Sequence, residues 1–152
     1  ETINSLIKSG KIKSFGVSNF TTSQMEMFSG KVKILYNQIN LSLTHVDQMF
    51  DGTLEYMQVN NILPMAYSPL GSYFKNENNE LKKVVTKLKN KYNCSDYQLL
   101  ISWLLNHPSK IIPIIGTTKS DRIKNSVKSL KIQIELIDWF ELLEASIGNR
   151  VP

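Results

Sequence analysis

The sequence predicts an α/β fold in which short parallel strands alternate with helices. Apolar runs typical of strands recur, each followed by polar residues and a helical pattern, at Ile12–Val17, Ile34–Ile39, Ile62–Tyr67 and Ile111–Ile115. This rhythm fits either an open sheet or part of a barrel. No Gly-x-Gly-x-x-Gly follows the first run and no Walker glycine loop is present, which disfavours the open nucleotide-binding sheets. We therefore expect part of a (β/α)8 barrel with about four βα units.

The chain opens on a helical pattern. Ile3, Leu6 and Ile7 have the i, i+3, i+4 spacing of a helix face, and Gly10 follows as a helix stop. The first residue is Glu and not Met. We therefore expect a fragment of a longer protein whose earlier elements precede residue 1.

Capping patterns mark the starts of three further helices. In each, a Thr, Ser or Asp is followed three residues later by Gln or Glu: Thr21 with Gln24, Ser95 with Gln98, and Asp138 with Glu141. Ile137 and Leu142 would add a hydrophobic staple to the last of these. The three pairs predict helices that begin just after Thr21, Ser95 and Asp138.

Two helices are predicted between the third and fourth strands. Their apolar faces are formed by Leu81, Val84, Val85 and Leu88 in one, and by Leu99, Leu100, Trp103 and Leu104 in the other. The pair His107-Pro108 ends the second helix. Within the strands, we expect Val17, Ile39, Ala66 and Ile115 to face the interior of the barrel.

Composition excludes several classes of function. No apolar run approaches the roughly 20 residues needed to cross a bilayer. Cys94 is the only cysteine, so neither an internal disulfide nor a cysteine metal pair is expected. The net charge of +5 comes from lysines scattered over helices, without the basic aromatic stripe of a nucleic-acid binder. We expect a cytoplasmic protein with no membrane and no nucleic-acid partner.

Polar residues gather where the predicted strands end, which is where barrels of this class place their chemistry. They are Ser18-Asn19, Gln38, Tyr67 to Gly71, and Gly116 to Lys119. Each group alone is typical of a turn. Together they indicate a site, because Asn and Gln can orient an amide-bearing ring and an aromatic ring can stack on it. The helix start beside Lys119 and Arg122 adds an anion site.

The order of these motifs resembles the aldo-keto reductase family. The matching segments are Gly10–Phe20, Tyr36–Gln38, Ala66–Gly71 and Pro113–Thr117. The ending, from Trp139-Phe140 to Val151-Pro152, resembles the bacterial YdhF-like branch of predicted oxidoreductases. The resemblance implies that residues 1–152 are the C-terminal half of an NADP-dependent oxidoreductase domain, a (β/α)8 TIM barrel whose N-terminal half is absent.

The resemblance also implies roles at the nicotinamide end of the cofactor NADP(H). Ser18, Asn19 and Gln38 match the family residues that hold the nicotinamide carboxamide. Tyr67 matches the ring that stacks on the nicotinamide, so it is not expected to replace the catalytic acid.

At the phosphate end, the resemblance assigns Ser68 and Leu70 to the pyrophosphate and Arg122 to the adenosine 2′-phosphate. The sequence departs from the family pattern after the last strand, where many members have a Lys-Ser pair. Here Gly116-Thr117 occupies that place and a lysine is displaced to Lys119. We therefore expect backbone N–H contacts from Gly116, Thr117 and Thr118 to the cofactor. Lys119 is the candidate for the lysine contact, although it is displaced from the family position.

The family's Asp, Tyr, Lys and His tetrad comes from the first four βα units, so none of the present residues is expected to be catalytic and no metal ligands are expected. His45 is expected in a loop and His107 at a helix end, neither with a carboxylate positioned by sequence. The resemblance implies hydride transfer between NADPH and a small carbonyl substrate in the intact protein, with this fragment inactive alone. Two alternatives are a non-enzymatic cofactor-binding subunit that regulates or contacts partners, and a phosphate-binding barrel of another reaction class.

Overall fold

The computed structural model describes residues 2–75 and 77–151. At its centre lies a sheet in the order β1-β2-β3-β4, with every neighbouring pair parallel. The strands are β1 (Phe15–Ser18), β2 (Ile34–Asn40), β3 (Leu63–Tyr67) and β4 (Ile112–Pro113). Strands that follow one another in the sheet as they do in the chain form the wall of a barrel. The predicted parallel sheet is confirmed.

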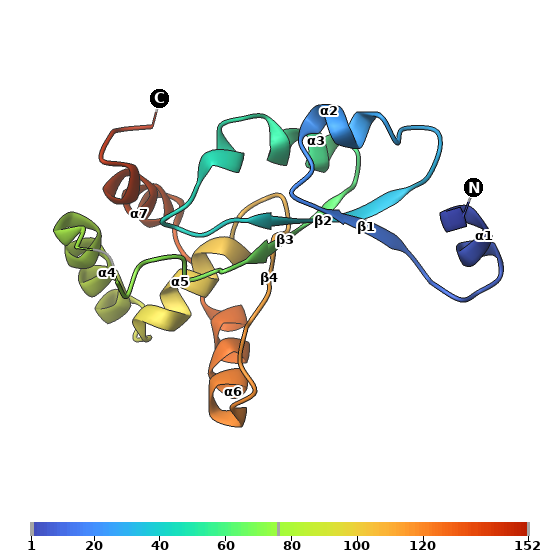
Figure 1. The fold of residues 1–152 in the computed structure, drawn as a ribbon. Helices are drawn as coiled ribbons and strands as arrows, with labels where there is room; N and C mark the ends of the chain where they lie inside the picture. The colour runs from blue at the N-terminus through green and yellow to red at the C-terminus, as the bar shows by residue number, and fades with distance from the viewer. Residues whose placement is uncertain (1, 76, 152) are drawn as a thin grey trace.

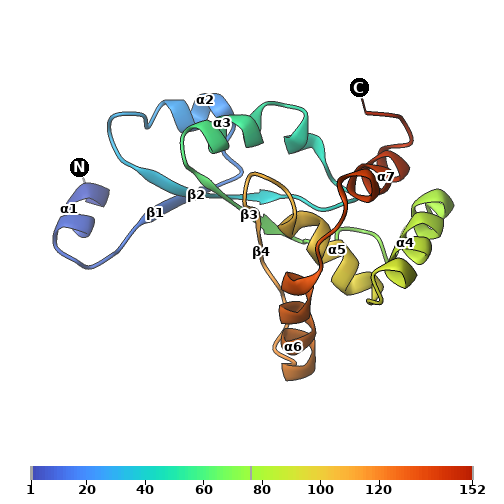
Figure 2. The same cartoon turned by 180° about the vertical axis from the view of Figure 1, so that it is seen from behind.

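Helices connect the strands and form an arc around them (Figures 1 and 2). They are α1 (Thr2–Lys8), α2 (Thr22–Glu26), α3 (Thr53–Val59), α4 (Asn79–Lys91), α5 (Asp96–Leu105), α6 (Ser120–Lys128) and α7 (Leu136–Ile147), with 3-10 turns η1 (Asp47–Met49) and η2 (Ser129–Lys131). In both views α1 stands apart from the other helices, whereas α4 and α7 lie side by side. Within the described ranges, no helix is long and apolar enough to span a lipid bilayer.

The two edge strands are shorter than predicted. The backbone N–H groups of Lys11 and Ile12 donate to the carbonyl of Leu6, so the chain before β1 continues the end of α1 instead of pairing with β2. At the other edge, Pro113 has no N–H to donate, and β4 is limited to two residues. One further bond, from the N–H of Ile114 to the carbonyl of Ala66 at 2.8 Å, continues the contact between β3 and β4.

The prediction that Val17, Ile39 and Ala66 face the barrel interior is wrong. Ile39 and Ala66 are buried in a cluster with residues of α4, α5 and α7, and Val17 packs beside buried Met25 of α2. Side chains alternate along a strand, so neighbours such as Gln38 fall on the opposite face. Strands of parallel sheets are commonly covered on both faces, so an apolar side chain can point either to the barrel interior or to the helices. The sequence alone therefore did not show which of the two faces Ile39 and Ala66 occupy.

Two of the three predicted helix caps are confirmed. The side chains of Thr21 and Ser95 accept hydrogen bonds from the backbone of Gln24 and Gln98, and both glutamines complete capping boxes. The third is wrong, because α7 begins at Leu136 and places Asp138 inside the helix. The expected staple also fails, since the side chain of Ile137 is 74% exposed.

Two hydrophobic clusters fill the space between sheet and helices. The larger, here called the C-terminal cluster, includes the predicted apolar faces of α4 and α5 and the side chains of α7. At its centre Trp103 and Trp139 stack at 4.9 Å, and each indole N–H donates to the other's backbone carbonyl. The smaller, here called the N-terminal cluster, has four buried members: Met25, Ile34, Met57 and Ile62.

Candidate functional site

The carboxyl ends of β1 and β2 are joined through the carbonyl of Gln38. It accepts the backbone N–H of Asn19 at 2.8 Å and the hydroxyl of Ser18 at 3.2 Å. Asn19 has φ of +53°, a left-handed turn conformation that Asn tolerates better than most residues. Because Ser18 and Gln38 are register partners, their side chains lie on the same face of the sheet. Three of the predicted nicotinamide residues are thus neighbours.

Asn37 supports this turn and was not singled out from the sequence. Its side chain is fully buried and forms two hydrogen bonds with the backbone of Phe20, donating to the carbonyl at 2.9 Å and accepting from the N–H at 3.3 Å. The signal that could have indicated it is its position two residues before Ile39, on the face of β2 that carries buried side chains, since a buried amide needs partners.

The loop after β3 rests on the loop after β2. Tyr67, half-buried, pairs with Asn40, and Ser68 follows with φ of +50°. The N–H of Gly71 donates to the carbonyl of Ser68 at 2.7 Å. A Cβ on Gly71 would lie 2.1 Å from the hydroxyl oxygen of Thr44, so only glycine permits this approach. The two loops are therefore packed against each other at the end of the sheet that carries Gln38.

A cavity of about 240 Å³ opens between the loop after β3 and the start of α6. It brings together five residues assigned from the sequence: Ser68, Leu70, Gly116, Thr117 and Arg122. Ile115, expected in the barrel interior, borders this cavity, as does Tyr97 of α5. Thr118 and Lys119 are exposed and are not among its lining residues.

The start of α6 suits an anion. Its N-cap residue, Lys119, makes no side-chain capping bond, so the first N–H groups of the helix have no cap acceptor. The backbone N–H of Lys119 donates to the hydroxyl of Thr117 at 3.2 Å, which closes the turn before the helix. Arg122 lies exposed in the first turn. Helix dipole and guanidinium thus both favour negative charge at this cavity.

The four residues Ser18, Asn19, Gln38 and Tyr67 lie outside the cavity at Arg122. They are grouped instead by strand register at the carboxyl ends of β1, β2 and β3. The predicted site therefore has two parts along one edge of the sheet, an amide-rich part and the cavity at Arg122.

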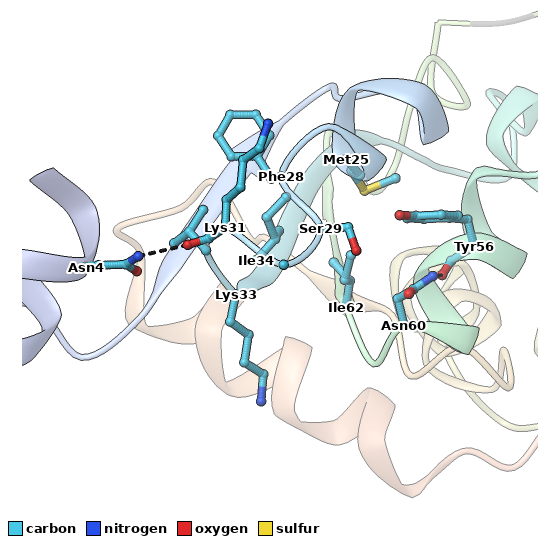
Figure 3. Close-up of a pocket in the computed structure, with 12 residues that line it drawn as sticks. Asn4, Met25, Phe28, Ser29, Lys31, Lys33, Ile34, Tyr56, Asn60 and Ile62 are labelled. Carbon is cyan, nitrogen blue, oxygen red and sulfur yellow. Dashed lines mark hydrogen bonds between the residues drawn. The ribbon is translucent and has the colours of Figure 1, made fainter. Parts of the chain in front are cut away.

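A second cavity, of about 390 Å³, lies at the opposite ends of the strands (Figure 3). Met25, Ile34 and Ile62 line it together with Tyr56 of α3 and Asn60, which caps the end of that helix. The side-chain amide of Asn4 donates to the carbonyl of Lys31 at 2.8 Å and ties α1 to its rim. None of the residues assigned from the sequence lines it, so it is separate from the candidate site.

The two histidines lie as expected, in a loop and after a helix. Burial lowers the pKa of His107, which packs against Trp139 and accepts the N–H of Ser109 through Nδ1. The expectation that no carboxylate accompanies His45 is wrong, since its Nε2 lies 3.8 Å from Asp47. Neither histidine lines the cavity at Arg122.

Fold and site together define a parallel barrel segment with a cavity, bordered by Arg122, at the carboxyl edge of its sheet. Residues 1–145 match the family model described as aldo/keto reductase family, and the chain belongs to that family. Over 155 residues it is 32% identical to the 6-dehydroglucose reductase of Agrobacterium fabrum, covering 99% of this chain and 52% of the relative. Over 160 residues it is 34% identical to the uncharacterized oxidoreductase YcsN of Bacillus subtilis, covering 100% and 53%.

A third relative is the oxidoreductase YdhF of Escherichia coli, 33% identical over 156 residues, with 97% of this chain and 51% of the relative covered. The resemblance to YdhF-like proteins is thereby confirmed. The chain spans about half the length of the curated relatives it matches.

Solved structures show the same fold. The thermostable aldo-keto reductase Tm1743 superposes with a TM-score of 0.85 at 23% identity, covering 94% of this chain and 52% of that one. An aldo/keto reductase from Klebsiella pneumoniae, solved with NADP and acetate, has a TM-score of 0.80 at 22% identity, covering 98% and 52%. The partial-barrel fold predicted from the sequence is confirmed.

Proposed function

We propose that residues 1–152 are the C-terminal half of an NADP(H)-dependent aldo-keto reductase barrel and bind the cofactor. The observation that carries the proposal is the cavity at Arg122, which joins the loop after β3 to the uncapped start of α6. These groups suit the diphosphate and the 2′-phosphate of a dinucleotide. A yeast relative, 31% identical over 127 residues, is named NADPH-dependent alpha-keto amide reductase.

In this proposal the two parts of the site have different tasks. Ser18, Asn19 and Gln38 orient the nicotinamide carboxamide, and the ring of Tyr67 packs on the nicotinamide. At the other part, Ser68 and Leu70 contact the diphosphate, Arg122 holds the 2′-phosphate, and backbone N–H groups of residues 116–118 add hydrogen bonds. Lys119, which does not line the cavity, contributes only charge.

The bound cofactor supplies the hydride that a small aldehyde or ketone accepts. We assign proton transfer to the resulting alkoxide to an N-terminal half of the barrel, since none of the described residues at the site is given that role. The described residues therefore act by binding and orientation alone.

The experiment is to express residues 1–152 alone and together with the upstream half as a separate polypeptide. Molecular mass and NADPH oxidation are then measured with a panel of aldehydes and ketones. We expect no turnover from this chain alone, and self-association through the open edges of β1 and β4. Activity that arises on mixing would support the proposal.

Turnover by a monomeric chain alone would overturn the division of tasks between the halves. Cofactor binding by the mixed halves without reduction of any carbonyl would instead favour the non-enzymatic, partner-binding alternative. Failure of the intact protein to bind NADPH would overturn the proposal itself.

A further inference from the structure

A cavity of about 360 Å³, here called the cavity at His107, lies between η1, the end of α5 and α7. It shares no lining residue with the cavity at Arg122 or with the cavity at the opposite ends of the strands. Its volume lies within the range of small-molecule sites in proteins. None of the roles considered so far accounts for it.

The cavity at His107 lies apart from the open edges of the sheet. Its lining residues come from η1, α5, α7 and the segments beside them, and none belongs to β1, β4, α1 or α6. In both views α7 lies on the opposite side of the molecule from α1 (Figures 1 and 2). We therefore expect an upstream half of the barrel, which would join the edges of β1 and β4, to leave this cavity accessible.

Large apolar side chains border the cavity and are exposed to water. Phe50 is 57% exposed and Leu136 is 73% exposed. The rings of Trp139 and Phe140, which also line the cavity, meet edge to face with centroids 5.2 Å apart. Exposed apolar groups gathered around a hollow mark a binding surface, and aromatic rings favour a flat ring as their ligand.

The lining offers no counter-charge to an ionic ligand. Among the described residues that line the cavity, only Asn106 and His107 have polar side chains, and none is an Asp, Glu, Lys or Arg. An ion that left water for this surface would lose its hydration without gaining a partner of opposite charge. The cavity therefore suits a neutral molecule.

The side-chain amide of Asn106 is committed to the protein. Its Nδ2 donates to the carbonyls of Ser102 and Ile132 at 2.8 and 3.0 Å. Its Oδ1 accepts the N–H of Ile134 at 3.2 Å. The amide thus holds α5 to the segment before α7 and leaves neither of its N–H groups for a ligand.

His107, in contrast, has one donor left. Its Nδ1 accepts the N–H of Ser109 at 3.2 Å, and burial lowers the pKa of the ring, so the ring is neutral near pH 7 with its proton on Nε2. Within the described ranges, no residue accepts a hydrogen bond from Nε2. The ring packs beside Trp139, with centroids 5.7 Å apart. One side-chain donor is therefore available beside the aromatic rings.

We propose that the cavity at His107 binds a neutral aromatic molecule that carries one strong hydrogen-bond acceptor. The acceptor takes the Nε2–H of His107. The flat ring of the ligand packs against Trp139 and Phe140, and Phe50 covers it from the rim. The inference goes beyond the proposed function, because this site is separate from the residues assigned to the cofactor.

The test is calorimetric titration of the intact protein with two probes, methyl phenyl sulfoxide and methyl phenyl sulfide. The probes share one skeleton, but only the sulfoxide oxygen is a strong acceptor, and neither probe contains the carbonyl that the proposed reaction would reduce. His107→Phe keeps a ring and removes the donor. It should weaken binding of the sulfoxide by about three- to ten-fold, the contribution of one hydrogen bond, and change binding of the sulfide by less than about two-fold.

Two further variants and the cofactor serve as controls. Phe50→Ala removes a ring from the rim, so both probes should bind about two- to five-fold more weakly. Val59→Ala shortens an 80% exposed apolar side chain that does not line the cavity, and both affinities should stay unchanged. Saturating NADPH should also leave both affinities unchanged, because cofactor and probe occupy separate cavities.

Three outcomes would overturn the proposal. An equal loss of sulfoxide and sulfide binding in His107→Phe would show that the defect concerns the shape of the cavity and not the donor. Displacement of either probe by NADPH would place that probe in the cavity at Arg122. No binding of either probe by wild type would exclude the site, and a dimer that Leu136→Ala dissociates in sedimentation would then identify a second copy as the occupant.

Discussion

The two hydrophobic clusters differ in size and in what they support. Among the residues that the structure describes, the C-terminal cluster has 19 buried members, whereas the N-terminal cluster has four, and α1 has no fully buried residue. The cavity at Arg122 lies next to α5 and α6, beside the larger cluster, whereas Ser18 ends a strand that packs on the smaller one, with Asn19 directly after it. Buried side chains are therefore distributed unevenly, and the cavity at Arg122 lies in the more densely packed region.

The largest expected effect tests that difference directly. Trp103→Ala removes a fully buried ring that stacks on Trp139, and it should lower the free energy of unfolding by about 3–5 kcal/mol. Leu6→Ala in α1 is the matched comparison and should cost clearly less, about 1 kcal/mol or below, since Leu6 is only partly buried. Urea denaturation of the 152-residue chain, to which these burials apply, gives both values. Similar costs would show that the two regions are equally packed.

The next effect concerns the cavity at Arg122, which lies beside the C-terminal cluster. Arg122→Ala in the intact protein should weaken NADPH binding by roughly ten- to a hundred-fold, because hydrogen bonds between charged groups contribute about 1.5–3 kcal/mol. NADH, which lacks the 2′-phosphate, should be nearly unaffected. Fluorescence titration with each cofactor measures both constants. Equal losses for the two cofactors would contradict the assignment of Arg122.

The amide-rich end should show a smaller response. Tyr67→Ala should raise the dissociation constant of NADPH by about three- to ten-fold, the contribution expected from a stacked ring. Tyr67→Phe keeps the ring, so turnover should be largely retained. Steady-state kinetics of the Phe variant provide the check. If turnover collapsed with cofactor affinity unchanged, Tyr67 would be a proton donor and the role given to it here would be wrong.

The smallest expected effect is the electrostatic contribution of Asp138 to the contact between α4 and α7. Burial alone would raise the pKa of Asp138, but hydrogen bonds from Lys91 at 2.7 Å and Tyr92 at 2.5 Å outweigh it and lower that pKa. A carboxyl whose pKa is lower in the folded state stabilises the protein above its unfolded pKa of about 3.9. This contribution is lost as the pH falls through the folded pKa.

Asp138→Asn should therefore cost up to about 1 kcal/mol at pH 7, because the exposed amine of Lys91 limits the strength of the pair. The difference from wild type should shrink below pH 4. Thermal denaturation of both proteins between pH 3 and 7 measures it. A constant difference over that range would show that Asp138 contributes through shape and not through charge.

Local sequence patterns predicted local structure well. The capping boxes at Thr21 and Ser95 depend on residues three positions apart, and both formed as expected. The similar pattern at Asp138 failed because its carboxylate is engaged by residues 46 and 47 positions earlier in the chain, which no local pattern contains. The apolar faces of α4 and α5 were likewise predicted, since helix periodicity alone determines them.

Features that depend on distant contacts were not predictable in the same way. The sequence indicated that Ile39 and Ala66 are buried but not that they face the helices, because alternation alone does not say which face the helices cover. The cavity at Arg122 combines Ser68, Thr117 and Arg122 as expected, yet Tyr97 of α5 also lines it. Tyr97 lies outside the sequence motifs that were assigned to the cofactor, so the sequence alone did not place it at this cavity.

The paired indoles have a spectroscopic consequence. Trp103 and Trp139 are the only tryptophans in the chain, and they share one apolar environment with the ring of His107 at 5.7 Å from Trp139. Intrinsic emission from this chain therefore reports the state of α5 and α7 and is blind to fraying of α1 or β1. An unfolding curve recorded by tryptophan emission will follow the firmer region, whereas far-ultraviolet circular dichroism will also register earlier loss of the first helix. Separation of the two curves on one denaturant axis would display the unequal packing of the molecule in a single experiment.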